Sequence, residues 1–414
     1  MKVKVNRYCI FLFILIFLEL DCFYLIDRYT TYIFGLNYID WLVVIRLTTV
    51  IFTILSVQTK ITKKLLLKFL PIGVIILTIT SAVAGNISYG QSFLNGIIAQ
   101  REWLSCSLMF YPIFIWLKNK KFTIRQLIEM LLVISMLYIS VCVLQYFLIN
   151  KIVFLHTSVN QRYGGTRLRF SSFYPAIVVG FIIDGLFDKN YRIDTFKNIF
   201  VLVGYLFLLA VITKGRMVTL AAIGGIGICM LLRRSSVTQK TFAIIVLLAT
   251  IVFLANSQIG RDALDVVFGS GTGTSADTIS IRNLEQAYYI KKVTQNPITV
   301  VLGCGYPSTD AIAQSISSPT IGYWTYYTTD VGIVGNFFCY GLLGIIWFAI
   351  LYIALLIKGY KIYKKSVRTC YLEFFIGDVL GCVSLWPLCY NFTIAFPIFF
   401  AMLEFEYEKI RMKE

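Results

Sequence analysis

Long apolar segments recur along the whole of this chain, and they constrain its fold more than any other feature. Several continue for roughly 18 residues or more with few charges, the length that a helix needs to cross the core of a bilayer. The chain is 58% hydrophobic and 14% charged, with a mean hydropathy of +0.77. Soluble domains are about half apolar and a quarter charged. We therefore expect an all-α polytopic protein that forms a single integral membrane domain over residues 1–414.

The apolar segments predict about twelve membrane-spanning helices. Their expected limits are 8–26, 39–57, 65–84, 104–117, 126–149, 171–187, 198–213, 217–232, 241–257, 331–357, 371–388 and 391–407, and the fourth is short unless it begins near Ser92. The first segment is similar to a signal peptide, but acidic residues follow it instead of a small-residue cleavage site, so we interpret it as a spanning helix. Arg46 lies within the second segment, and we expect it to pair with a buried acid such as Glu129 or Asp184.

Basic residues are concentrated in alternate loops. With the loops numbered alternately from the N-terminus, the set that includes 1–7, 118–125 and 358–368 holds 25 of the 38 Lys and Arg residues. Cytoplasmic loops of membrane proteins collect these residues. We therefore expect both termini in the cytoplasm and the chain in a bacterial cytoplasmic (inner) membrane. The same rule explains the net charge of +17 without a nucleic-acid partner.

Two loops on the opposite, outer side are longer than the rest, at about 150–170 and about 258–329. Long loops in compact proteins are usually functional or disordered. The longer loop contains Trp, Tyr, Gly and Pro and no run of like charge, so we expect it to fold over the outer face. A short helix is expected near 280–295, with Asp277 or Ser280 as its N-cap and Pro297 just beyond its end.

Most of the basic residues in the outer loops are arginines. Positive charge on the outer side is unexpected, because Lys and Arg normally collect in the cytoplasmic loops. The guanidinium group is planar, always charged and suited to bidentate contact with phosphate, so we expect these residues to bind an anionic ligand. The candidates are Arg162, Arg167, Arg169, Arg216, Arg261 and Arg282. The alternative is that they contact lipid headgroups or pair with Asp262 and Asp265. Arg216 is the sharpest case because it lies between two spans with almost no loop.

Acidic and aromatic residues of the same loops could complete a site. Asp330 and Glu285 are candidate general bases for a hydroxyl nucleophile, with Asp310 and His156 as competitors; Asp330 could also be a simple N-cap. Tyr323, Trp324 and Tyr326 could stack on sugar rings or form an interfacial aromatic belt. The ten cysteines form no metal-ligand spacing and there is one histidine, so we expect no metal and no cofactor.

Four segments together resemble the superfamily of O-antigen polymerases and ligases. They are Arg162–Pro175, Thr213–Arg216, Arg282–Gly305 and Asp330–Gly344, in the order and on the side of the membrane typical of that family. The ligase branch usually carries a His-Asn pair near the end of the long loop, where this chain reads Thr328-Thr329-Asp330. Its absence favours the O-antigen or capsular polysaccharide polymerases of the Wzy type. In the Thr213–Arg216 segment, this chain has Lys214 where the superfamily usually has a serine.

The resemblance implies a metal-independent glycosyltransferase of the membrane-embedded, GT-C-like class. Such an enzyme transfers a growing glycan from undecaprenyl pyrophosphate to a lipid-linked acceptor repeat unit. Arg216, Arg282 and one or more of Arg162, Arg167 and Arg169 would bind the pyrophosphate of the donor, the acceptor or both. Asp330, Glu285 and Arg216 are the catalytic candidates. Membrane lipid, a flippase and a chain-length regulator would be its partners. The alternatives are a flippase for lipid-linked oligosaccharides, an O-antigen ligase and a structural subunit of an export complex.

Overall fold

The computed structural model describes residues 6–56, 69–162, 165–187, 195–233, 241, 274–366, 368–383, 385–387, 390 and 393–412. Helices make up most of these residues. The strands among them form three antiparallel hairpins: β1 (Tyr32–Ile33) with β2 (Leu36–Asn37), β3 (Val159–Arg162) with β4 (Gly165–Leu168), and β5 (Thr320–Ile321) with β6 (Trp324–Thr325). This agrees with the expected all-α class.

The helical elements of the described residues range from 3 to 34 residues in length. They are α1 (Arg7–Glu19), α2 (Asp21–Tyr24), α3 (Tyr38–Ser56), α4 (Phe69–Tyr89), α5 (Phe93–Ala99), α6 (Arg101–Leu108), α7 (Phe110–Lys118), α8 (Ile124–Leu148), α9 (Phe173–Phe187), α10 (Thr195–Phe207), the π-helical turn η3 (Leu208–Ile212), α11 (Arg216–Leu232), α14 (Thr274–Val293), α15 (Pro297–Leu302), α16 (Ala311–Ser317), the 3-10 turn η4 (Thr328–Asp330), α17 (Ile333–Ser366), α18 (Cys370–Gly381) and α19 (Ala395–Arg411). The helix expected near 280–295 is present as α14, but it already begins at Thr274, so the expectation that Asp277 or Ser280 is its N-cap is wrong.

Among the described residues, four helical stretches are long and apolar enough to cross a membrane. They are Tyr38–Ser56, Leu70–Tyr89, Ile124–Leu148 and Ile333–Ser366. Three shorter apolar stretches, Phe173–Gly185, Phe196–Ile212 and Met217–Leu232, lie where further spans were expected. These helices support a membrane protein, whereas the number of about twelve spans stays a prediction. The segment expected at 241–257 lies outside the described residues, apart from residue 241.

The first expected span, 8–26, is wrong beyond Glu19. Residues 21–24 form a left-handed turn with φ of 54°, 52°, 61° and 62°. Each residue in this conformation costs about 1–2 kcal/mol relative to a right-handed helix. Specific contacts offset part of that cost: the Nε of Arg28 donates to both carboxylate oxygens of Asp21 at 2.9 and 3.0 Å, and its Nη2 donates to the Glu19 carbonyl at 2.8 Å.

The fourth expected span, 104–117, is divided. The chain from Ser92 to Lys118 forms three short helices, α5, α6 and α7, with breaks at Gln100 and Met109. The Gln100 side chain stays inside the protein and donates to the carbonyls of Gly96 and Thr78, at 2.9 and 3.4 Å. Side-chain contacts to α4 therefore replace a continuous helix here. The last two spans also shift, because α18 ends at Gly381 and α19 begins at Ala395.

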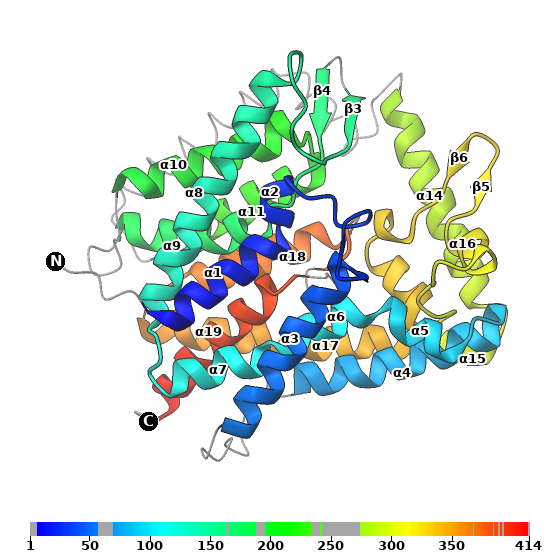
Figure 1. Cartoon of the computed structure of the whole chain (residues 1–414), viewed down its shortest axis with the longest axis horizontal. Coiled ribbons are helices and arrows are strands. Elements are labelled where there is room, and N and C mark those ends of the chain that lie inside the picture. Colours follow the sequence, from blue (N-terminus) through cyan, green and yellow to red (C-terminus); the bar gives the residue numbers. More distant parts are fainter. Residues whose placement is uncertain are drawn as a thin grey trace.

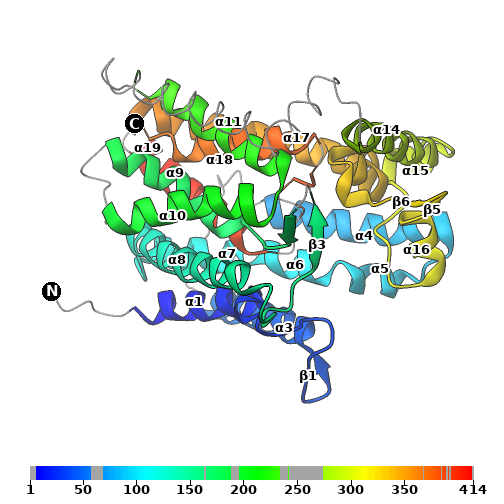
Figure 2. The same ribbon diagram turned by 90° about the horizontal axis from the view of Figure 1, so that it is seen from above.

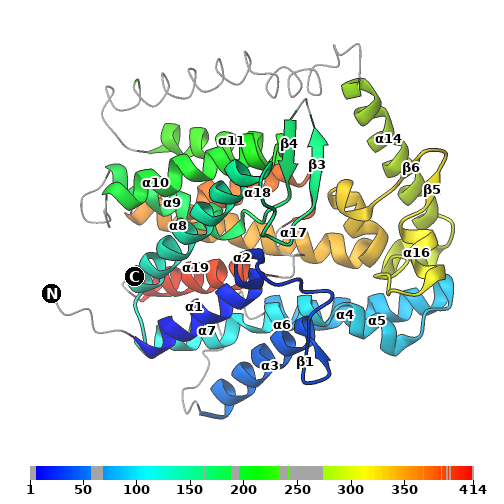
Figure 3. The same ribbon diagram turned by 45° about the horizontal axis from the view of Figure 1, so that its top comes forward.

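The bundle has two distinct ends (Figure 1). The N- and C-termini lie at one end, and α14, α15, α16 and the β5–β6 hairpin gather at the other. Helices α14 and α15 pack against α17, and α15 and α16 also contact α4. Figure 2 shows the β1–β2 hairpin projecting from the helices. Figure 3 shows the β3–β4 hairpin and α14 rising on the same side of α17. The described helices of the longer loop, α14, α15 and α16, thus lie away from α1 and the end of α19.

A buried carboxylate joins four helices of the bundle. Glu19 at the end of α1 accepts hydrogen bonds from Arg46 of α3 at 2.8 Å and Tyr174 of α9 at 2.6 Å. It also accepts the backbone N–H of Ile394, at the start of α19, at 3.0 Å. Arg46 is completely buried. The expectation that Arg46 pairs with Glu129 or Asp184 is therefore wrong, because Glu19 is the acid that the fold brings to it.

The two acids expected beside Arg46 have other partners. Asp184 of α9 pairs with Arg233 at 2.7 Å and accepts the backbone N–H groups of Thr369 and Cys370, at the start of α18. Glu129 pairs with Arg125 one turn earlier in α8, at 3.0 Å, and both side chains are exposed. The buried pair Glu19–Arg46 and the exposed pair Glu129–Arg125 can therefore be compared for their contributions to stability.

We predict that Glu19→Gln destabilises the protein strongly and that Glu129→Gln does not. Glutamine keeps the shape of Glu19 but leaves the charge of Arg46 buried without its counter-ion, which costs about 3–5 kcal/mol when one partner of a buried pair is lost. The exposed pair contributes about 0–1 kcal/mol. Thermal unfolding in detergent measures both, and equal melting temperatures for the two variants would contradict the role of Glu19.

Candidate functional site

A cavity of about 390 Å³ lies between α11, α18 and the chain segment just before α9. We call it the α11–α18 cavity. Its lining combines acids with aromatic and small apolar residues, and comprises Phe170, Ser171, Ser172, Phe173, Ala176, Tyr205, Val218, Ala221, Ala222, Thr329, Asp330, Glu373, Phe374, Gly377, Asp378, Gly381, Leu385 and Trp386. Carboxylates beside aromatic rings suit a ligand that has hydroxyl groups and apolar ring faces.

Segments far apart in the sequence meet around this cavity. Phe170 follows the arginine-rich β3–β4 hairpin, Val218 lies in the first turn of α11, and Asp330 ends η4. Each lies in or next to a segment whose sequence contains a candidate anion-binding arginine or a candidate general base. The Nε of Arg167 donates to the Thr213 carbonyl at 2.7 Å, so the hairpin is attached to the turn that leads into α11. The structure therefore gathers these segments at one place.

The turn between η3 and α11 is tight. Lys214 is buried and has a left-handed backbone with φ of 45°, and the Gly215 N–H returns to the Leu209 carbonyl at 3.2 Å. Arg216 then opens α11. A helix N-terminus presents unpaired N–H groups and a partial positive charge, which favours a nearby anion. The turn thus brings the backbone of Arg216 next to the first residues that line the cavity.

Three candidate residues from the long loop come together beside the cavity. The Nη1 of Arg282 in α14 donates to the backbone carbonyl of Asp330. Glu285 lies one turn further along α14 and is 4% exposed. Burial raises the pKa of Glu285 to about 7, the negative Asp330 adds to the rise, and Arg282 and the Tyr327 N–H oppose it. A buried carboxyl that titrates near neutral pH beside an arginine is a typical functional-site group.

The structure describes the side chains of only some of the other candidate arginines. Arg169 is exposed at the end of the β3–β4 hairpin, directly before Phe170. The side chains of Arg162 and Arg216 lie outside the described part of the structure, as do all of Arg261, Asp262 and Asp265. Arg167 and Arg282 are thus the candidates whose side-chain contacts tie the hairpin and α14 to the cavity wall.

Asp310, a competing candidate for the general base, instead forms hydrogen bonds that stabilise the loop around it. Its carboxylate accepts the Ser308 hydroxyl at 2.7 Å and the Asn95 side chain of α5 at 3.3 Å. The nearby Gly303-Cys304-Gly305 sequence forms a turn pressed against the bundle: the Cys304 N–H donates to Phe338 of α17 at 2.7 Å. A Cβ on Gly305, where φ is 96°, would lie 2.3 Å from the Gly85 nitrogen. This segment therefore joins the outer helices to α4 and α17.

The three candidate stacking aromatics differ in accessibility. Tyr323 is 100% exposed and Trp324 is 54% exposed, at the tip of the β5–β6 hairpin. Tyr326 is 5% exposed and packs edge-on against Tyr288 of α14, with ring centroids 5.9 Å apart. The first two rings can contact a ligand or the membrane interface. The ring of Tyr326 has little surface left for a sugar and instead fixes the hairpin to α14.

Two acids of the cavity were missed by the sequence reasoning. Glu373 and Asp378 lie on α18 and line the α11–α18 cavity. Glu373 is 5% exposed, and its Oε2 has no hydrogen-bond partner among the described residues. The available signal was an acid inside the apolar segment 371–388, because ionisable residues in spanning segments are functional candidates by default. No group of three or more side chains suited to a metal ion occurs in the described ranges.

No protein-family model matches this chain, and no curated protein matches it. The functional argument therefore depends on the geometry of the cavity and of the charged groups around it.

We predict that Tyr326→Ala lowers stability and that Tyr323→Ala does not. Removing a buried aromatic ring costs about 3–5 kcal/mol, whereas exposed substitutions change stability by about 0.5 kcal/mol or less. Thermal unfolding of the purified variants in detergent is the measurement. If both variants unfold with the wild-type midpoint, the packing of Tyr326 against Tyr288 does not hold the hairpin.

Proposed function

We propose that this chain is a membrane-embedded, metal-independent glycosyltransferase that polymerises a surface polysaccharide such as a capsule, exopolysaccharide or O-antigen. It transfers a growing glycan from undecaprenyl pyrophosphate to the acceptor sugar of a lipid-linked repeat unit. The observation that carries the proposal is the group Glu285, Arg282 and Asp330 beside the α11–α18 cavity. Asp330 lines this sugar-sized space, Arg282 donates to the Asp330 carbonyl, and the neighbouring Glu285 is a buried acid whose pKa is raised to about 7.

Glu285 acts as the general base in this reaction. A base is most effective when its pKa is close to the working pH, because it is then both deprotonated and a useful proton acceptor. Burial and Asp330 give Glu285 a pKa of about 7. The acceptor hydroxyl loses its proton to Glu285 as its oxygen bonds to the anomeric carbon of the donor. Asp330 lines the cavity and orients that hydroxyl.

The arginines stabilise the leaving group. As the bond between the anomeric carbon and the phosphate oxygen breaks, both bonding electrons stay on undecaprenyl pyrophosphate. Preorganised donors next to that developing charge each contribute about 10²–10³ in rate. Arg167 and the turn before Arg216 lie together, and Arg169 directly precedes Phe170, which lines the cavity. Arg282 supplies a further guanidinium at Asp330.

The arrangement of the bundle fits a substrate that arrives on a lipid carrier. Apolar helices supply a membrane-embedded body, and α14–α16 lie at the end away from the termini. With the termini in the cytoplasm of a bacterial cell, the helices α14–α16 face the outside, where a flippase would deliver repeat units. A chain-length regulator would contact the same outer side.

The buried charges favour an enzyme over a flippase. A flippase that carries an anionic lipid headgroup needs accessible charge along its path through the bilayer. In the described part of the chain, the deeply buried charges include the closed pairs Glu19–Arg46, Asp184–Arg233 and Lys358–Glu404. Closed pairs hold helices together and leave less charge for a moving headgroup.

We predict that Arg216→Ala and Arg282→Ala each abolish long-chain product without lowering the protein level. In the proposed mechanism each variant lacks a guanidinium that stabilises the leaving group, so the rate falls by about 10²–10³. The variants are expressed in a deletion strain, and the glycan pattern is read on a gel. Lys291→Ala is the matched control, because Lys291 is exposed in the same helix as Arg282 and should leave the pattern unchanged.

The deletion strain itself distinguishes the alternatives. A strain without a polymerase exports single repeat units, one without a flippase retains them inside the cell, and one without a ligase builds long chains that stay on the carrier. Either of the last two patterns, or long chains made by the arginine variants, would overturn the proposed activity.

We predict that the polymerisation rate rises with pH through about 7 and that Glu285→Gln removes this dependence. The pKa of Glu285 is raised in the folded protein to about 7. The active, deprotonated form is therefore scarce at pH 5.5 and dominant at pH 8.5. Initial rates of the purified protein across this range provide the test. A pH profile that is flat in the wild type would exclude Glu285 as the base.

A further inference from the structure

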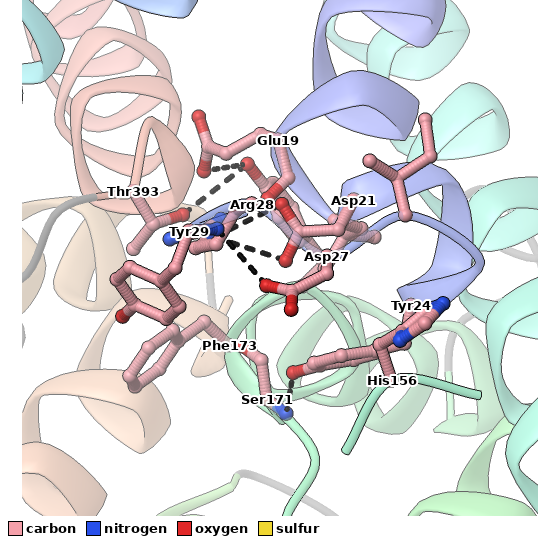
Figure 4. A pocket seen from close by; sticks show the side chains of 13 residues that line it. Glu19, Asp21, Tyr24, Asp27, Arg28, Tyr29, His156, Ser171, Phe173 and Thr393 are labelled. Atoms are coloured by element: carbon pink, nitrogen blue, oxygen red, sulfur yellow. Dashed lines mark hydrogen bonds and ion pairs between the residues drawn. The ribbon is translucent and has the colours of Figure 1, made fainter. Parts of the chain in front are cut away.

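A second cavity, of about 310 Å³, is also lined in part by the chain segment that precedes α9 (Figure 4). We call it the Arg28 cavity. It shares Ser171 and Phe173 with the α11–α18 cavity, so the two adjoin. Its lining comes from the end of α1, the left-handed turn α2, the loop after it, His156, the start of α9 and Thr393 before α19. Among the candidate pyrophosphate-binding arginines whose side chains the structure describes, Arg167, Arg169 and Arg282, none lines it.

The charges of the Arg28 cavity are unfavourable for a phosphate. The negative charge of Glu19 is compensated by Arg46, and that of Asp21 by Arg28. Asp27 adds a further negative charge: the Tyr29 N–H donates to its carboxylate at 3.0 Å and lowers the pKa of Asp27, so it is ionised at neutral pH. The lining is thus neutral to slightly negative, which disfavours a phosphorylated group and allows a neutral one.

The chemical groups that line the cavity suit a carbohydrate. Asp27 and Thr393 offer hydrogen-bonding oxygens, and His156 offers ring nitrogens. Figure 4 shows the rings of Tyr29 and Phe173 on one side of the space and His156 on the other. Tyr29 is 72% exposed, so a ligand can reach its ring. Polar groups facing aromatic rings match the hydroxyls and apolar faces of a sugar, and the volume is at the small end of ligand pockets.

Backbone contacts fix the shape of this cavity before any ligand binds. The Tyr24 hydroxyl accepts the Ser171 N–H at 2.8 Å, and the Tyr24 carbonyl accepts the His156 N–H at 2.7 Å. These bonds attach the left-handed turn to both outer segments near the cavity. A wall of left-handed, non-glycine residues persists only where its surroundings hold it, and such backbone is concentrated at functional sites.

We propose that the Arg28 cavity binds a sugar residue of the donor glycan, while the α11–α18 cavity binds the acceptor sugar. This inference rests on the proposed polymerase function. The reaction joins two glycans and therefore requires two sugar sites that adjoin, which Ser171 and Phe173 provide. The acceptor belongs beside the general base Glu285, so the donor sugar occupies the other cavity. Arg169 directly precedes Phe170 and the shared residue Ser171, so in this arrangement its guanidinium would bind the donor pyrophosphate near the junction of the two cavities.

The test uses the double variant Tyr29→Ala, His156→Ala in the purified full-length chain. Both side chains are exposed, so their loss should not disturb folding, and neither touches the reacting groups. Tyr32→Ala is the control, because Tyr32 is 67% exposed in the adjacent β1 but does not line the cavity. The donor is a lipid-linked chain of several repeat units from the host strain, and single lipid-linked units at saturating concentration are the acceptor.

We expect the double variant to raise the KM for the donor roughly tenfold or more, because it loses both an aromatic ring contact and a hydrogen-bonding group. Its kcat and its KM for the acceptor should stay within about twofold of the wild type. The Tyr32→Ala control should match the wild type in all three values. An unchanged donor KM in the double variant, or an equal rise in the acceptor KM, would overturn the assignment.

A binding measurement separates this inference from the proposed activity. The probe is the repeat-unit oligosaccharide released from its lipid carrier by mild acid, titrated into the purified chain. Binding that is weakened by the double variant and not by Tyr32→Ala supports a carbohydrate site even if the wild type forms no polymer. Equal binding by all three proteins overturns the site, whatever the outcome for polymerisation.

Discussion

The need to compensate each buried charge organises this protein. In a low-dielectric interior, an unpaired charge is so unfavourable that the helices must meet where their charges can pair. Glu19 illustrates this: it draws α3 through Arg46, α9 through Tyr174 and α19 through Ile394 to the end of α1. Asp184 does the same for α9 and α18. The positions of α9, α18 and α19 then define both cavities.

Breaks in regular structure occur next to the sites. The left-handed turn 21–24 follows Glu19 directly and forms a wall of the Arg28 cavity. Lys214, also left-handed, precedes the helix that lines the α11–α18 cavity. Continuous helices would fill space with side chains, whereas these breaks leave room and expose backbone groups. The chain thus gives up local helical stability beside the two cavities, and the surrounding contacts hold the irregular backbone in place.

The candidate site was partly accessible from the sequence. Arg282, Glu285 and Asp330 could be named in advance because they are charged residues in an aromatic-rich loop, and the structure brings them together. Glu373 was missed because its significance depends on the cavity beside α18, which no local pattern shows. Tyr326 was grouped with Tyr323 because they are neighbours in sequence. Tyr323 lies in the turn of the β5–β6 hairpin, whereas Tyr326 follows β6 and packs against Tyr288 of α14, so the first is exposed and the second buried.

The sequence by itself determined the helical, membrane-compatible class and the location of the apolar helices. Hydropathy is a local property that sums along a segment, so α3, α4, α8 and α17 can be recognised without knowledge of their neighbours. Only the tertiary structure decided which acid pairs with Arg46, where the first helix breaks, and which segments enclose a cavity. These outcomes depend on contacts between residues far apart in the chain, such as Glu19 with Ile394, and no local window contains both partners.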